Sequence, residues 1–105
     1  MSWVRLAKTG DLEPGGKGCI TSVHNQEIAL FRTADGYHAV QNSCPHRGAP
    51  LGQGHLDGQD VLCPWHGWTF NVKTGQCVTT PGMDLKTYPV RVEGENVMVD
   101  VPEVL

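Results

Sequence analysis

The sequence is poor in the features that direct a protein to membranes or nucleic acid. Its 105 residues hold only eight lysines and arginines against eleven aspartates and glutamates, for a formal net charge of −3. Binding to nucleic acid or to an anionic membrane surface needs clustered cations, and here they are scattered. No apolar run reaches the length of a membrane span, and the opening MSWVRLAKTGDLEPGG lacks a signal-peptide core. We therefore expect a cytoplasmic protein with neither nucleic acid nor a membrane as its partner.

The sequence also lacks a segment with the periodicity of an amphipathic helix. Short apolar segments rich in β-formers alternate with turn residues, and Thr33–Gly36 (TADG) carries the Asp-Gly signature of a tight hairpin. The length suits one domain. We expect a single all-β domain over residues 1–105, made of several small antiparallel sheets. The predicted strands are 3–7, 19–23, 27–32, 37–41, 69–72, 76–79, 86–92 and 97–101.

Cysteine is scarce, with four in the chain. In a reducing compartment thiols stay reduced, so cysteines next to histidines indicate a metal rather than a disulfide. Only Cys44 and Cys63 have a histidine within three residues. Cys19 and Cys77 fall in predicted strands with no histidine nearby, and we interpret both as small buried thiols.

Two short stretches each combine one thiol with one imidazole. Cys44 and His46 form C-x-H, Cys63 and His66 form C-x-x-H, and residues 47–62 separate the two pairs. Prolines and glycines in both stretches suit sharp backbone bends. The four donors fit a zinc ion or a two-iron cluster. Zinc fingers usually keep cysteines and histidines in separate halves, whereas each half is mixed here. That arrangement favours a binuclear iron–sulfur centre in which two histidines replace two cysteines on one iron.

C-P-H-R-G followed by C-P-W-H-G-W resembles the two cluster-binding boxes of Rieske [2Fe–2S] proteins. The rest of the chain is similar, less strongly, to the soluble Rieske-type ferredoxins. The resemblance implies a cluster-binding subdomain with loops at about 43–49 and 62–68. It implies that the cysteines of the two boxes, Cys44 and Cys63, bind the buried iron of one [2Fe–2S] cluster per chain. His46 and His66 would bind the outer iron, and a third loop with Pro81 would cover the cluster.

Two departures from high-potential Rieske proteins imply a low reduction potential. Those proteins carry an extra, disulfide-bonded cysteine in each box, where this chain has Ala49 and Trp65. They also hydrogen-bond cluster sulfur with a serine and a tyrosine, where Trp68 and Phe70 stand here. Fewer donors stabilise the more negative reduced cluster less, so we expect a potential near about −150 mV, the low end of the Rieske range.

These features indicate an electron carrier rather than an enzyme, since no nucleophile or acid–base pair with a recognisable motif occurs. The resemblance implies a monomer that carries electrons from a reductase to an oxygenase or another redox acceptor. The closing KTYPVRVEG is also similar to the Rieske-like small subunit of NAD(P)H-dependent nitrite reductases. A zinc-stabilised binding module is the third alternative. His55, between the boxes, is interpreted as a solvated loop residue, and Trp65 as a candidate docking residue.

Overall fold

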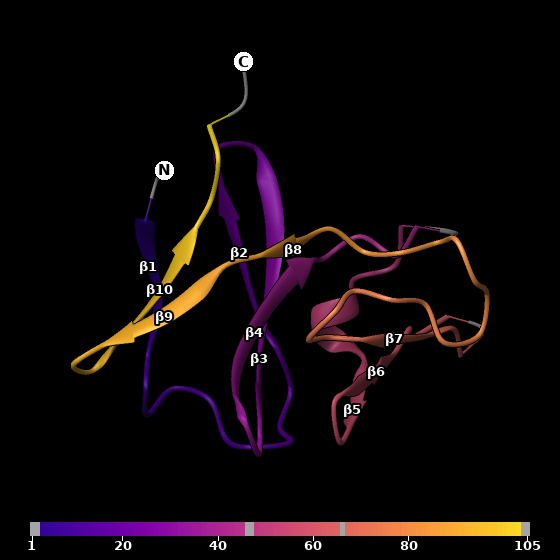
Figure 1. Cartoon of the computed structure of the whole chain (residues 1–105), viewed down its shortest axis with the longest axis horizontal. Helices are drawn as coiled ribbons and strands as arrows, with labels where there is room; N and C mark the ends of the chain where they lie inside the picture. Colours follow the sequence, from indigo (N-terminus) through magenta and orange to yellow (C-terminus); the bar gives the residue numbers. More distant parts are fainter. Residues whose placement is uncertain (1–2, 46–47, 66, 104–105) are drawn as a thin grey trace.

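The structure, a computed structural model, describes residues 3–45, 48–65 and 67–103. In these ranges the chain forms strands and one short 3₁₀ helix, η1 (Leu51–Gln53) (Figure 1). No helix in them is long and apolar enough to cross a membrane. The strands are β1 (Trp3–Lys8), β2 (Cys19–Val23), β3 (Gln26–Thr33), β4 (Gly36–Gln41), β5 (His55–Asp57), β6 (Asp60–Leu62), β7 (Thr69–Asn71), β8 (Thr87–Tyr88), β9 (Val90–Glu93) and β10 (Asn96–Asp100).

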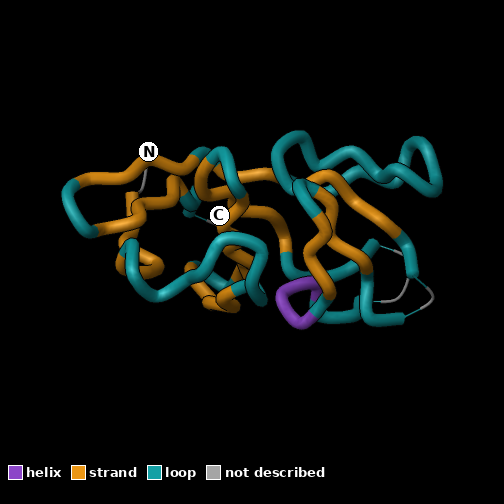
Figure 2. Tube along the Cα trace, turned by 90° about the horizontal axis from the view of Figure 1, so that it is seen from below, coloured by secondary structure: helices purple, strands orange, loops and turns teal. Residues whose placement is uncertain are grey.

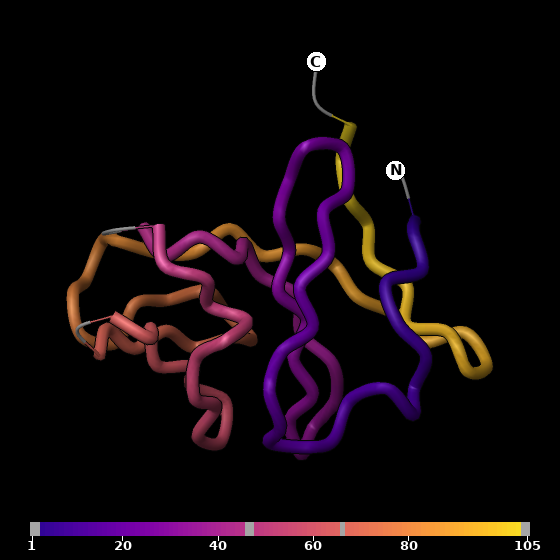
Figure 3. The backbone as a smooth tube through the Cα atoms, turned by 180° about the vertical axis from the view of Figure 1, so that it is seen from behind, coloured from indigo at the N-terminus to yellow at the C-terminus, as the bar shows by residue number. Residues whose placement is uncertain are grey.

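The strands form three antiparallel sheets, in the orders β1-β10-β9, β2-β3-β4-β8 and β5-β6-β7. This confirms the all-β fold of small antiparallel sheets. The third sheet belongs to the segment between β4 and β8, which we call the inserted subdomain (residues 42–86). β1 and β10, near the two chain ends, lie on the side away from it (Figures 1 and 3). Figure 2 shows that loops, rather than strands, make up the far end of this subdomain.

Strand β3 lies between two hydrophobic cores and contributes side chains to both. Side chains alternate along a strand, so Ile28 and Leu30 pack into one core, with β1 and β10, while Ala29 and Phe31 face the other. All four are fully buried, which explains the unbroken apolar run of the sequence here. The second core fills the inserted subdomain and contains both candidate cysteine ligands. Strand β4 also contributes to both cores, with Val40 in one and Ala39 in the other, so β3 and β4 together join the inserted subdomain to the other two sheets, which we call the base.

Most predicted strands are confirmed within one or two residues, but the segment 76–79 is not a strand. Only an isolated bridge between Phe70 and Cys77 forms there. The predicted strand 86–92 is in fact two strands, because the chain passes from one sheet to another at Pro89. β8 pairs with β4, whereas β9 pairs with β10.

Strands β5 and β6 form a hairpin where the sequence pattern predicts a loop, and His55 therefore lies in a strand. Each strand is three residues long and contributes one buried side chain, Leu56 or Val61. Such short segments with one apolar residue each carry no alternating pattern to detect. Burial of these two side chains in the core of the inserted subdomain accounts for the hairpin.

Candidate metal centre

The two candidate loops share one backbone design. The amide of Cys44 donates to the carbonyl of Ala49 at 2.9 Å, and the amide of Cys63 donates to that of Trp68 at 2.7 Å. A glycine directly precedes the closing residue in each loop, with φ of 73° at Gly48 and 69° at Gly67. L side chains rarely adopt this left-handed conformation, so both loops need glycine at that position. The motif C-P-x-x-G therefore encodes two matching loops, each with its cysteine at the closed end.

The structure brings the two cysteine side chains together at the buried base of the loops. Cys44 and Cys63 are only 1% and 3% exposed. Burial raises the pKa of the Cys63 thiol to about 11; the backbone N–H of Trp65 opposes the shift, and contact with the Cys44 side chain adds to it. The Cys63 group is therefore a neutral thiol on its own, and a bound cation would make it a thiolate. Two soft donors in one dry site, with an N–H directed at sulfur, fit an iron–sulfur cluster.

The predicted histidine ligands, His46 and His66, lie outside the described residues, as does Arg47. Their neighbours in the two loops are placed: Gly48, Trp65 and Gly67 are exposed. The loops therefore run from buried cysteines toward solvent. Among the described residues no three His, Cys, Asp or Glu side chains gather into a metal site. His55 is exposed on β5, as expected for a solvated residue.

The positions that distinguish high-potential relatives hold no bridge and no hydroxyl. The four cysteines of the chain all lie in the described ranges, and no disulfide joins any of them. Ala49 is fully buried while Trp65 is 50% exposed, so these two positions face different surroundings. Trp68 packs beside the core of the inserted subdomain, and Phe70 is fully buried within it. The nearby hydroxyl of Thr69 donates to the carbonyl of Gly67 at 3.3 Å and so supports the second loop rather than a sulfur.

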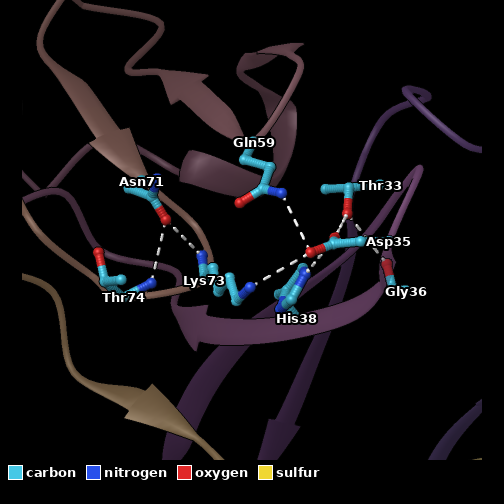
Figure 4. A network of polar contacts seen from close by, with 8 residues as sticks. All are labelled: Thr33, Asp35, Gly36, His38, Gln59, Asn71, Lys73 and Thr74. Atoms are coloured by element: carbon cyan, nitrogen blue, oxygen red, sulfur yellow. Dashed lines mark hydrogen bonds and ion pairs between the residues drawn. The ribbon is translucent and has the colours of Figure 1, made fainter.

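A polar network that the sequence pattern does not predict ties the inserted subdomain to the base (Figure 4). Asp35, in the β3–β4 turn, accepts hydrogen bonds from Thr33 Oγ1 at 2.5 Å and Gln59 Nε2 at 3.0 Å. Its carboxylate also contacts His38 Nε2 at 3.1 Å and Lys73 Nζ at 3.5 Å. The Thr33 bond first, and then His38, hold the pKa of Asp35 well below its usual range. Gln59 and Lys73 follow Asp35 by many residues, so no local sequence pattern predicts their contacts with its carboxylate.

Comparisons with known proteins give a matching family and a relative of similar length. The Rieske [2Fe-2S] domain family matches residues 2–89. The ferredoxin component of the naphthalene 1,2-dioxygenase/salicylate 5-hydroxylase systems of Ralstonia sp is 36% identical over 99 residues, 93% of this chain and 94% of that protein.

Two solved structures have the same fold. One is a complex of reduced oxygenase and oxidized ferredoxin in carbazole 1,9a-dioxygenase, with a TM-score of 0.87 and 31% identity over 98% of this chain and 96% of that chain. The other is described as an NADH-dependent nitrite reductase small subunit from Mycobacterium tuberculosis, with a TM-score of 0.88 and 28% identity over 98% and 97%. These matches favour an iron–sulfur cluster over zinc, and the chain belongs to the Rieske [2Fe–2S] domain family.

Proposed function

We propose that this chain is a cytoplasmic one-electron carrier that uses a Rieske-type [2Fe–2S] cluster to pass electrons from a reductase to an oxygenase. The observation that carries the proposal is the pair of matching loops, which joins Cys44 and Cys63 at a buried base. The acceptor class is supported by the Ralstonia relative, named as the ferredoxin component of dioxygenase systems, and by the solved complex of an oxygenase with a ferredoxin. We further propose that residues 1–105 act as one domain and as a monomer when free.

The four ligands we assign are Cys44 and Cys63 for the inner iron, and His46 and His66 for the outer iron. When bound, the cluster supplies a site that takes up and releases one electron. Two ferric ions, two sulfides and two thiolates sum to zero charge, which becomes −1 on reduction. The chain stabilises that negative charge with backbone N–H donors, of which the Trp65 amide on the Cys63 sulfur is one.

Docking through the exposed loop end fits the surface of the described residues there. Trp65 and Val78 are 50% and 58% exposed, and Met83 is 37% exposed. Large exposed apolar side chains near a redox centre are the kind that anchor a transient partner. Short-range docking at this end would place the proposed histidine ligands next to the acceptor.

Ligand replacement tests the assignment. In wild-type protein we expect iron and acid-labile sulfide in near-equal amounts. His46→Cys and His66→Cys should each abolish or alter the Rieske optical and EPR spectra, and Cys44→Ser or Cys63→Ser should lose iron. His55→Gln is the matched control and should keep the wild-type spectra. Spectra that persist unchanged in either His→Cys variant would exclude that residue as a ligand.

A second candidate is the small subunit of a nitrite reductase complex, favoured by the match to the Mycobacterium tuberculosis structure. Purification from the native cell separates the two. Stable co-purification with a large reductase subunit supports the enzyme-complex role, whereas a free monomer that is reversibly reduced supports the carrier.

A further inference from the structure

The segment 78–84 is a mostly exposed loop held at two buried ends. Cys77 and Leu85 are 2% and 5% exposed, and both pack in the core that contains Cys44 and Cys63. Between them only Thr80 is partly buried, and the others are exposed. The conformation of this loop therefore depends on a few polar contacts rather than on apolar burial.

Three of those contacts involve Cys77. Its sulfur accepts a hydrogen bond from the backbone N–H of Thr80 at 3.3 Å and lies 3.6 Å from Thr79 Oγ1. Its own N–H donates to Asp84 Oδ1 at 3.1 Å. One residue thus binds the loop near its start and near its end. The Thr80 bond also bends the chain just after Cys77, where the sequence pattern predicts a continuing strand.

The same loop is attached to the strand that follows the second ligand loop. The amide of Val78 donates to the carbonyl of Thr69 at 2.7 Å, and the amide of Thr69 donates to Thr79 Oγ1 at 3.2 Å. Thr69 directly follows Trp68, whose carbonyl closes the loop at Cys63. The sulfur of Cys77 is therefore linked to a proposed iron ligand, Cys63, by three polar contacts that run through Thr79, Thr69 and Trp68.

We propose that Cys77 is a positioning residue, whose sulfur acts as a hydrogen-bond acceptor that holds residues 78–84 as the third loop beside the iron–sulfur site. This rests on the proposed function for its redox consequence. The Cys77 sulfur is used as a hydrogen-bond acceptor and not as a ligand. A loop released from this acceptor would admit water to the site, and water favours the more negative, reduced cluster.

Three substitutions at Cys77 separate the acceptor from the packing. Cys77→Val keeps an apolar side chain but removes the acceptor, Cys77→Ala removes it with less volume, and Cys77→Ser restores an acceptor oxygen. Cys19→Val is the matched control, because the Cys19 sulfur also contacts a threonine hydroxyl two residues on, Thr21 Oγ1 at 3.9 Å, but in β2 of the base. Hydrogen exchange is followed by mass spectrometry on peptides that cover residues 76–85 of the loaded protein. Redox titration and EPR follow the cluster.

Exchange in this peptide should be about fivefold faster in Cys77→Val and Cys77→Ala, as expected for the loss of one hydrogen bond. Both variants should show a raised potential and altered EPR line shape, while Cys77→Ser and Cys19→Val stay close to wild type. The proposal would be overturned if Cys77→Val and Cys77→Ala kept the wild-type exchange rate and potential. It would also be overturned if Cys77→Ser changed as much as they did. Loss of iron from all three variants would make Cys77 a ligand and would overturn it as well. Wild-type protein without iron would instead contradict the proposed function, and the exchange rates would still decide the role of the sulfur.

Discussion

The amide of Cys63 and the carbonyl of Trp68 are joined by a 2.7 Å hydrogen bond, which closes the second ligand loop at its base. Cys44 and Ala49 close the first loop in the same way. The two loops differ in where the histidine stands: third in C-P-H-R-G and fourth in C-P-W-H-G. The proposed ligand set therefore combines one shared loop backbone with a histidine at two different positions of the motif.

The reduction potential should be low. No described side chain at Ala49, Trp65, Trp68 or Phe70 offers a bridge or a hydroxyl to the cluster. Spectroelectrochemical titration should give a midpoint below zero and near about −150 mV. Phe70→Tyr adds a hydroxyl at a fully buried position and should raise the midpoint if that hydroxyl reaches sulfur. A wild-type midpoint above zero would contradict this account of the departures.

The two cores should respond differently to the same cavity. Leu30 and Leu51 are both fully buried, the first in the base core and the second in η1, in the core of the inserted subdomain. Leu30→Ala and Leu51→Ala should each lower the free energy of unfolding by about 2–5 kcal/mol. Only Leu51→Ala should also change the EPR spectrum or the rate of iron loss. Urea titration and iron release to a chelator measure the two effects, and equal iron loss in both variants would argue against separate cores.

Asp35 should make stability depend on pH. Its pKa in the folded protein lies well below the ordinary value of 3.8, so its contribution is complete above that value and is lost as the pH falls through the acid range. Asp35→Asn should therefore be less stable than wild type at neutral pH, and the difference should shrink below about pH 4. Thermal unfolding from pH 3 to pH 8 measures this.

Asp57→Asn, at an exposed aspartate of β5, is the control for the loss of one negative charge. It should lower stability less than Asp35→Asn at neutral pH. The Asp35 carboxylate contacts Thr33, Gln59 and Lys73, whereas within the described ranges no such set of partners surrounds the Asp57 carboxylate. A constant difference between wild type and Asp35→Asn across the whole pH range would show that the carboxylate charge is not what the network stabilises.

Trp65 should contribute to partner docking. It is half exposed within the second ligand loop, and removal of such an anchor commonly costs more than 1 kcal/mol of binding. Trp65→Ala should lower the second-order rate of electron transfer to the oxygenase about fivefold or more, with iron content retained. Trp3→Ala is the control, because Trp3 lies on β1 of the base, under the guanidinium of Arg91. An equal loss in both variants would place the docking surface elsewhere.

The sequence by itself determined the elements whose signals are local. The run of apolar residues in β3 requires burial on both faces, and the Asp-Gly pair marks the β3–β4 hairpin. C-P-x-x-G specifies each ligand loop within a few residues, because proline and glycine restrict or free the backbone where the bend occurs. The two loops proposed to bind the cluster are therefore encoded by residues that are neighbours along the chain.

Tertiary structure alone decided the features that join distant residues. The hairpin of β5 and β6 forms because Leu56 and Val61 complete a core, not because of a strand pattern. Asp35 meets Lys73 only after the inserted subdomain has packed on the base. The bend after Cys77 likewise includes a hydrogen bond from the backbone N–H of Thr80 to the buried Cys77 sulfur. Such contacts depend on three-dimensional proximity, which residue type and spacing along the chain do not encode.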